Sequence, residues 1–368
     1  MQTEKKQSLF SKLNEFVISR SSIPFIQKVF FVSHLRTMIG AGISLVESLT
    51  IIQKEVESPR LNQTITQIKE DIEQGQTLSK TLEKHEELFP SAYVKMIEAG
   101  EVSGNLQQSL EQVETQMKKT QSLVSSIRSA MIYPSVIVGA MLVVGIIMVV
   151  VVLPKITVMF KEFNTELPLA TRVLIGITNY LSDPLFLTIF LVLLFSAIIG
   201  HIVLLKKVSG YKFAVHSITI RLPIFGKIIK KINLSRFSFT LSSLLKSAIP
   251  IVDAIHITAN TCSNALYKKA LHATATEVEK GTPLSEELSK YPRIFPPTVT
   301  GMLYVGEKSG EIDALLHELS KFYTEEVDKT MKNFATIIEP LVILILGLGV
   351  AGIAVAVVSP MYSLIQNF

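Results

Sequence analysis

The stretch EAGEVSGNL at residues 98–106 recurs as YVGEKSGEI at residues 304–312, so the chain contains Gly-Glu-x-Ser-Gly twice. The two copies are offset by 206 residues (306 − 100). The same offset relates further positions without a gap, namely Gly75 and Gly281, Leu78 and Leu284, Phe89 and Phe295, Pro134 and Pro340, and Pro154 and Pro360. A match at one fixed period indicates an internal duplication. We expect two copies of one unit, at about 31–162 and 237–368.

Three long apolar stretches accompany the duplication. Hydrophobic residues make up 48% of the 368 residues, and the mean hydropathy of +0.41 is high for a water-soluble chain. The stretches at 135–153, 185–205 and 341–358 are each close to the roughly 20 residues that cross a bilayer core. One such run alone could be a buried core helix, whereas three favour membrane spans. The first 30 residues contain no long apolar run, so we expect no cleavable signal peptide.

The distribution of basic residues predicts the orientation in the membrane. The segment 206–236 contains eight Lys and Arg residues and no Asp or Glu. Because basic residues beside a span favour the cytoplasmic side, we expect cytoplasmic domains at 25–132 and 206–338. An outer loop at 154–184 and an outer tail at 359–368 follow from this orientation. The net charge of +5 is then concentrated where it can meet anionic lipids, and we expect no nucleic-acid partner.

Both cytoplasmic domains show helical periodicity. Phe31 and Leu35 begin an apolar stripe with the spacing of one helix face, and no stretch alternates as a strand does. Ser44 and Thr77 are suited to cap helix N-termini. The sequence predicts an all-α membrane protein with two duplicated helical-bundle domains of about six helices each. Three transmembrane helices and an N-terminal extension at 1–24 complete this organisation.

A turn between two helices explains the glycines and serines of the repeated motif. We expect Gly100 to end one helix with a left-handed backbone and Gly104 to lie at the start of the next. Ser103 or Asn105 can cap this second helix. The second copy has the same residues at Gly306, Ser309 and Gly310. Each half is therefore predicted to contain a tight helix–helix joint.

The glutamates of the motif, Glu101 and Glu307, are not required by a turn. Each could favour the following helix through the helix dipole or receive a basic side chain. Contact with an external partner protein is the alternative. The sequence leaves these interpretations open.

Two prolines, Pro134 and Pro340, stand where the last cytoplasmic helix of each half meets an apolar stretch. Proline inside a helix removes a hydrogen bond and clashes with the preceding turn, which bends the helix. We therefore predict kinks at both span entries. Tyr133 is expected to anchor the membrane interface, and Glu339 is expected in the headgroup region.

Motifs for catalysis or cofactor binding are missing from the sequence. No GxxxxGK[ST], HExxH or GxSxG occurs, so we expect no ATP binding or hydrolysis and no enzymatic activity. The single Cys262 and the weak pair His256 and His272 offer no metal cluster, so we expect no cofactor. The apolar stretches contain glycines but few polar side chains, which favours helix packing over a solute path.

The duplication, the spans and the repeated motif together resemble the type II secretion F family. This family contains the inner-membrane platform proteins of type IV pili and their type II secretion counterparts. The resemblance covers about residues 25–368. It rests on MIGAGISLVESL, GQTLSKTLEKHEELFP, MIEAGEVSGNL and MIYPSVIV in the first half and on GTPLSEEL, VGEKSGEIDALL and IIEPLVIL in the second.

The resemblance implies a non-enzymatic protein of the bacterial inner membrane. Its expected partners are a cytoplasmic hexameric secretion or pilus ATPase, pilin or pseudopilin subunits, membrane lipids and further copies of the chain itself. The implied role is to couple the ATPase to the insertion of subunits into a filament. A membrane transporter or permease subunit is the competing class.

The sequence departs from the family pattern in two respects. Ala248 stands where the first half has Gly42, and Ser33 and Phe239 stand where the family often has arginine. We expect these changes to alter a partner surface without changing the fold.

Overall fold

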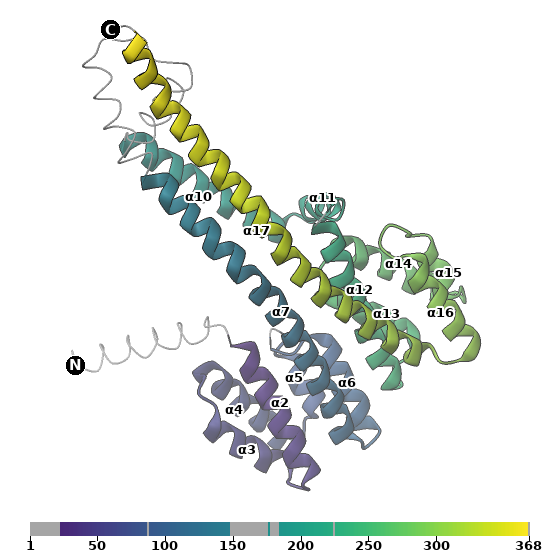
Figure 1. The fold of residues 1–368 in the computed structure, drawn as a ribbon. Helices are drawn as coiled ribbons and strands as arrows, with labels where there is room; N and C mark the ends of the chain where they lie inside the picture. The colour runs from purple at the N-terminus through teal and green to yellow at the C-terminus, as the bar shows by residue number, and fades with distance from the viewer. Residues whose placement is uncertain (1–22, 87, 148–175, 177–183, 224, 367–368) are drawn as a thin grey trace, which may run out of the picture. The chain divides into compact units, whose positions relative to one another are not determined.

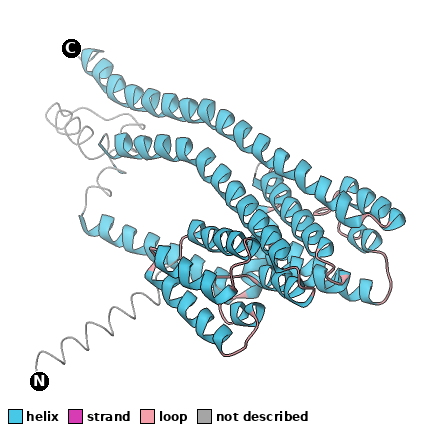
Figure 2. Cartoon of the chain, turned by 90° about the horizontal axis from the view of Figure 1, so that it is seen from below, coloured by secondary structure: helices cyan, strands magenta, loops and turns pink. Residues whose placement is uncertain are grey.

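The computed structural model describes residues 23–86, 88–147, 176, 184–223 and 225–366. All regular secondary structure within these residues is helical (Figure 2). The expected all-α class is thereby confirmed. The extension predicted at 1–24 and the loop predicted at 154–184 lie almost wholly outside the described residues.

The chain divides into two compact units. The first combines Met1–Ser125 with His216–Val327 and holds the soluble parts of both repeats. The second combines Ser126–Val215 with Asp328–Phe368 and holds the apolar stretches. Two long helices, α7 (Leu106–Ile147) and α17 (Ile312–Gln366), begin in the first unit and end in the second (Figure 1).

In the first unit the helices of the two repeats follow one another in the same order. The first repeat contains α2 (Phe25–Gly40), α3 (Leu45–Glu55), α4 (Pro59–Glu73), α5 (Leu78–Glu83), α6 (Ser91–Val102) and the start of α7. The second contains α12 (Phe225–Lys246), α13 (Ile251–Thr261), α14 (Ala265–Glu279), α15 (Leu284–Ser289), α16 (Pro297–Ser309) and the start of α17. The sequence offset therefore reappears as a repeated succession of helices.

Equivalent aromatic pairs lie in the core of the two repeats. The ring centroids of Phe31 and Phe89 are 5.5 Å apart, and those of Phe237 and Phe295 are 5.1 Å apart. All four side chains are almost completely buried. Large buried aromatic side chains contribute strongly to stability through the apolar area that they remove from water. The pairs join the first helix of each repeat to the segment before α6 or α16.

Side chains from the two repeats also meet within the first unit. Gln116 donates a hydrogen bond to the Thr240 hydroxyl (3.2 Å), and the Lys119 ammonium lies 4.0 Å from the centroid of the Phe239 ring. A cation over an aromatic face is attracted by the ring. Burial lowers the pKa of Lys119. Phe239, one of the departures from the family pattern, therefore contacts the first repeat.

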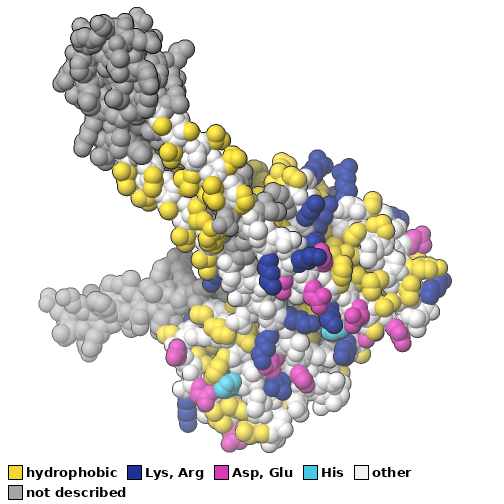
Figure 3. Space-filling model, viewed as in Figure 1, with side chains coloured by type: hydrophobic (Ala, Val, Ile, Leu, Met, Phe, Trp, Pro, Cys, Tyr) yellow, Lys and Arg dark blue, Asp and Glu magenta, His cyan; other side chains and the backbone are white. Residues whose placement is uncertain are grey.

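The second unit has an apolar, exposed surface. Leu106–Ile147 and the Thr188–Lys207 part of α10 (Pro184–Lys207) are long and apolar enough to cross a membrane. On the face that Figure 3 shows, hydrophobic side chains gather on the described part of this unit, and charged side chains are spread over the first unit. The described part of α17 contributes a shorter apolar stretch, Val342–Gly352. The third predicted span, at 341–358, remains a prediction.

The last described residues of the chain are helical. α17 continues to Gln366, and the outer position predicted for the tail at 359–368 remains a prediction. No helix-ending glycine occurs after Gly352, and the apolar sequence up to Val358 allows the helical pattern to continue. The residues after 358 therefore prolong the helix.

Candidate functional site: the two Gly-Glu-x-Ser-Gly turns

The repeated motif forms the predicted joint between two helices in each repeat. The first copy links α6 to α7, and the second links α16 to α17. Gly104 and Gly310 have φ values of +72° and +77°, in the left-handed region that glycine enters without a steric penalty. The N–H of Asn105 donates to the Gly100 carbonyl (2.8 Å), which closes the end of α6.

The motif's first glycine has a different role from the one predicted. Gly100 and Gly306 lie inside α6 and α16 and are buried. A Cβ atom on Gly100 would lie 2.1 Å from the Ser109 Oγ, and one on Gly306 would lie 3.0 Å from the Ile312 Cα. The expected left-handed backbone at these positions is therefore wrong. Glycine is needed because the next helix passes too close for a side chain.

The serines of the motif also bond differently from the prediction. The Ser103 hydroxyl donates to the Gly100 carbonyl, and the Ser309 hydroxyl donates to the Gly306 carbonyl, both at 3.4 Å. Each serine therefore bonds to the helix that ends, whereas we expected Ser103 or Asn105 to cap the helix that begins. Asn105 is the residue immediately before α7.

Glu101 binds the N-terminus of another helix. Its carboxylate accepts hydrogen bonds from the backbone N–H groups of Leu78 (2.6 Å) and Ser79 (2.9 Å) and from the Ser79 hydroxyl. These N–H groups begin α5 and have no partner within that helix. A carboxylate at this place also interacts favourably with the helix dipole. The glutamate thus stabilises the start of α5, which precedes it by 23 residues, and not α7, which follows it.

Glu307 makes the same contacts in the second repeat. It accepts from the N–H groups of Leu284 (2.5 Å) and Ser285 (3.3 Å) and from the Ser285 hydroxyl. The two glutamates therefore tie α5 to α6 and α15 to α16. Sequence reasoning missed this role. The signal was present, because a Leu-Ser pair precedes each glutamate at the same separation.

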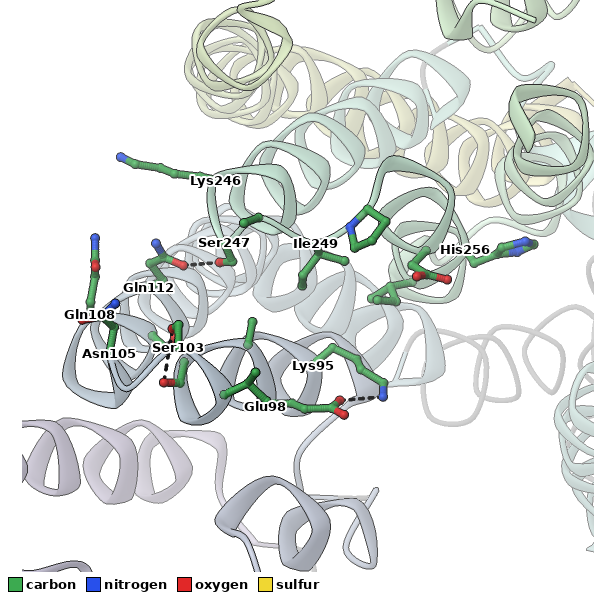
Figure 4. A pocket seen from close by; sticks show the side chains of 18 residues that line it. Lys95, Glu98, Ser103, Asn105, Gln108, Gln112, Lys246, Ser247, Ile249 and His256 are labelled. Atoms are coloured by element: carbon green, nitrogen blue, oxygen red, sulfur yellow. Dashed lines mark hydrogen bonds and ion pairs between the residues drawn. The ribbon is translucent and has the colours of Figure 1, made fainter. Parts of the chain in front are cut away.

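A groove of about 730 Å³ adjoins the first motif within the first unit (Figure 4). Ser103 and Asn105 line one side, and the turn between α12 and α13 lines the other. The Ser247 hydroxyl donates to Gln112 across this groove. Ala248 in the same turn has a φ of +58°, the only positive φ of a non-glycine residue in the described part of the chain. Ala248 therefore adopts the left-handed backbone conformation that Gly42 adopts at the equivalent position of the first repeat.

The described residues contain no group of three or more His, Cys, Asp or Glu side chains that could hold a metal ion. His256 and His272 lie together, with their Nδ1 atoms 3.1 Å apart. Burial and the neighbouring His256 lower the pKa of His272. Burial raises the pKa of the Cys262 thiol to about 12, so this cysteine is a poor nucleophile.

Both span-entry prolines lie inside uninterrupted helices. Pro134 is in α7 and Pro340 is in α17. Neither proline ends its helix, so each joins a soluble repeat to an apolar segment within one element. The predicted kinks remain predictions.

The helical fold and the duplicated helix–turn–helix joint are consistent with the family that the sequence matches. The family type II secretion system (T2SS), protein F, matches residues 31–154 and 237–360. The chain therefore belongs to this family. The matched segments are offset by the same 206 residues (237 − 31), which confirms the duplication. As a family member the chain is an assembly platform component of a type IV pilus or type II secretion machine and not an enzyme.

Relatives from both kinds of machine cover most of the chain. It is 32% identical to the type IV pilus assembly protein PilC of Thermus thermophilus over 91% of this chain and 82% of the relative. It is 31% identical to PilC of Pseudomonas aeruginosa over 91% and 88% of the two chains. It is 28% identical to the type II secretion system protein F of Aeromonas hydrophila over 95% and 89%. The family and the two long apolar helices indicate an inner-membrane protein.

Proposed function

We propose that this chain couples a cytoplasmic hexameric ATPase to the insertion of pilin or pseudopilin subunits into a filament. Family membership supports this role, as do relatives named as type IV pilus assembly and type II secretion proteins. The two soluble repeats contact the ATPase, and the membrane helices guide the filament subunits. Several copies of the chain form the platform.

The continuity of α7 and α17 carries this proposal. Each helix begins directly after a Gly-Glu-x-Ser-Gly turn and runs without interruption into an apolar segment. Because each helix loses only the backbone hydrogen bond at Pro134 or Pro340 on its way into the apolar segment, displacement of a soluble repeat is transmitted along it. The glutamate at each turn supports this transmission, since it fixes the preceding helix pair.

Paired substitutions in α7 test the coupling. Ser125 and Ser126 lie at the boundary between the two units. Replacing both by glycine should weaken the helix there, because glycine costs about 1 kcal/mol per residue relative to alanine. We expect S125G/S126G to fold, insert and co-purify with the ATPase, but to support few filaments in cells. The matched S125A/S126A variant should assemble normally.

Comparison of S125G/S126G with S125A/S126A distinguishes a loss of mechanical coupling from a loss of protein stability. Normal filament assembly by a well-folded S125G/S126G variant would contradict transmission along α7. Loss of co-purification with the ATPase in both variants would instead indicate a contact surface at these serines. Failure of the unsubstituted chain to co-purify with the ATPase would remove the proposed partner.

The proposed topology places both soluble repeats in the cytoplasm. The spans at 135–153, 185–205 and 341–358 then leave 154–184 and the C-terminus outside. The charge distribution supports this orientation, because the segment 206–236 contains eight Lys and Arg residues and no Asp or Glu. In this arrangement Pro134 and Pro340 bend their helices at the membrane entry.

Cysteine labelling in intact cells tests the topology. Val102 is 86% exposed, so V102C reports on the first soluble repeat, and T165C reports on the proposed outer loop. The native Cys262 is buried and should give little background. An impermeant maleimide should label T165C and spare V102C until the cells are opened. Labelling of V102C with protection of T165C would reverse the orientation.

A further inference from the structure

A basic hollow of about 330 Å³ lies beside the turn between α11 (Ser209–Thr219) and α12. Its lining includes four cationic side chains: Arg221, Lys227, Lys230 and Arg293. No Asp or Glu occurs among the described residues that line it. The cations come from three places in the fold, namely the turn itself, the first two turns of α12 and the loop between α15 and α16.

None of these four cations pairs with a carboxylate in the part of the chain that the structure describes. Lys231, next to them in sequence, does form an ion pair with Glu326 (2.6 Å). Four positive charges around one hollow repel one another, so a bound anion would stabilise the arrangement. Arginine guanidinium groups and lysine ammonium groups both donate charge-assisted hydrogen bonds to phosphate oxygens. The dipole at the N-terminus of α12 adds to this preference.

The turn that gathers these cations is tightly built. Gly226 is buried, and a Cβ atom there would lie 2.2 Å from the Ile220 carbonyl oxygen. Its N–H donates to the Leu222 carbonyl (2.9 Å). Arg221 directly follows Ile220 and Lys227 directly follows Gly226, so this close approach fixes the backbone next to two of the cations. The hollow is therefore set by the backbone and not only by mobile side chains.

Exposed apolar side chains beside the hollow distinguish a membrane lipid from a soluble anion. Ile218, Leu222 and Phe225 are 61%, 42% and 52% exposed. A site for a soluble phosphate compound needs no such side chains, whereas cations next to exposed apolar groups are typical of surfaces that enter the membrane interface. Arg221 also follows the end of the apolar helix α10, at Lys207, by only 14 residues (221 − 207).

We propose that this hollow binds the phosphate headgroup of an anionic phospholipid of the inner leaflet. The assignment of this phospholipid to the inner leaflet rests on the cytoplasmic orientation proposed above. The first repeat lacks the required residues, because Glu87 and Pro24 stand 206 positions before Arg293 and Lys230. The second repeat alone would thus be fixed to the membrane surface by its headgroup contact, which orients it relative to the bilayer.

Lipid titration of the full-length protein in detergent tests the proposal. The probes are short-chain phosphatidylglycerol, short-chain phosphatidylcholine and inorganic phosphate, with bound lipid counted by native mass spectrometry. The K227Q/R293Q variant removes two charges from the hollow, and K206Q/K207Q removes two charges at the end of α10. K227Q/R293Q should weaken phosphatidylglycerol binding about tenfold or more, since each basic residue near an anionic surface contributes roughly a factor of five. The K206Q/K207Q control should weaken it less than about threefold, because neither lysine lines the hollow and a more distant exposed charge is screened.

Three outcomes would overturn the proposal. Equal weakening by both variants would indicate non-specific attraction of charge. Inorganic phosphate that competes at the same affinity as phosphatidylglycerol would indicate a soluble-anion site. Absence of saturable binding would leave the hollow without a ligand. If K227Q/R293Q does not accumulate, R221Q/R293Q replaces it. Co-purification with the ATPase, measured on the same variants, distinguishes loss of the lipid site from failure of the proposed coupling role.

Discussion

The two repeats share the glutamate that joins their helices but surround it with different polar contacts. Glu101 and Glu307 each bind the first backbone N–H groups of a six-residue helix. In the first repeat the Thr77 hydroxyl also accepts from the N–H of Lys80. In the second repeat Pro283 occupies the equivalent position and makes no side-chain cap. At the N-terminus of α15, Glu307 therefore has no second side-chain cap beside it at the position before the helix.

The repeats differ more strongly where their first and last helices pack together. In the first repeat Glu114 accepts hydrogen bonds from Ser33 (2.9 Å) and Arg36 (2.5 Å) and pairs with Lys118 (2.6 Å). The equivalent residues of the second repeat are Phe239, Ser242, Ser320 and Thr324. A charged cluster is replaced by hydroxyl groups and an aromatic ring. The bonds from the glutamate to backbone N–H groups are kept in both copies. The side-chain contacts between the first and last helices differ, because polar groups there can be satisfied by other hydrogen-bond partners.

The largest expected effect is at the first glycine of the motif. Gly100→Ala should lower the free energy of unfolding by about 3 kcal/mol, because its Cβ would lie 2.1 Å from the Ser109 Oγ and 2.5 Å from the Ser109 Cβ. Gly306→Ala should cost about 1 to 2 kcal/mol, since its nearest contact is 3.0 Å. Urea unfolding of the purified protein in detergent measures both.

A second substitution identifies the cause in the first repeat. Ser109→Gly removes both colliding side-chain atoms, so G100A/S109G should be more stable than G100A despite the cost of glycine in a helix. A double variant no more stable than G100A would show that the collision is not responsible.

The charged cluster gives the next effect. Glu114→Gln should destabilise the protein by about 2 kcal/mol at neutral pH, because Arg36 loses a charged partner and the buried acceptor is weakened. Burial acts to raise the pKa of Glu114, but hydrogen bonds from Lys118 and Ser33 and the charge of Arg36 outweigh it and lower the pKa.

The pH dependence of this difference follows from the lowered pKa. Stabilisation by Glu114 is fully present above the unfolded-state pKa of about 4.3 and is lost as pH falls through the lower folded-state pKa. The stability gap between the unsubstituted protein and E114Q should therefore close only in acid. Ser320→Ala, at the equivalent position of the second repeat, should show a small difference that does not change with pH. A gap that closes above pH 6 would exclude Glu114 as its source.

Replacing the glutamates of the joints should destabilise the protein less than Glu114→Gln does, and by different amounts in the two repeats. Glu307→Gln should cost about 1.5 kcal/mol, because its amide presents a donor to a backbone N–H and α15 has no second cap. Glu101→Gln should cost about half as much, because Thr77 remains. The double variant E101Q/T77A should lose about as much stability as E307Q. Equal costs for the single variants would mean that Thr77 contributes nothing.

Filament assembly by the same glutamine variants tests the remaining interpretation of these residues. The carboxylates bind within the chain, so assembly should fall only as far as protein stability does. A variant with normal stability and no filaments would support an external partner contact at Glu101 or Glu307.

An effect of about the same size as that of Glu101→Gln concerns the turn between the first two helices of each repeat. Gly42 has a φ of +82° and Ala248 a φ of +58°. Ala248→Gly should stabilise the protein by about 1 kcal/mol, and Gly42→Ala should destabilise it by a similar amount, since a Cβ atom is strained in this region. Thermal unfolding of both variants measures the pair. Changes of the same sign would contradict the backbone explanation.

The sequence predicted the joints but not their internal contacts. The glycine pattern located the turns correctly, because left-handed glycine at Gly104 and Gly310 is a local property of a helix end. The roles of Gly100 and Gly306 could not be read in the same way, because close approach depends on the path of the next helix. The basic hollow was missed for a similar reason, since Arg293 is far from Arg221 in sequence and only the fold brings them to one cavity.

The sequence by itself determined the helical class, the duplication and the family, because periodicity, a constant offset and motifs are properties of residue order. Only the tertiary structure decided what each motif residue contacts. Glu101 and Glu307 lie 23 residues after the helices whose N–H groups they bind. A carboxylate can satisfy any nearby unpaired donor, so its residue type does not specify which helix it stabilises. That choice is made when packing of α5 against α6, and of α15 against α16, brings one helix start within hydrogen-bond distance.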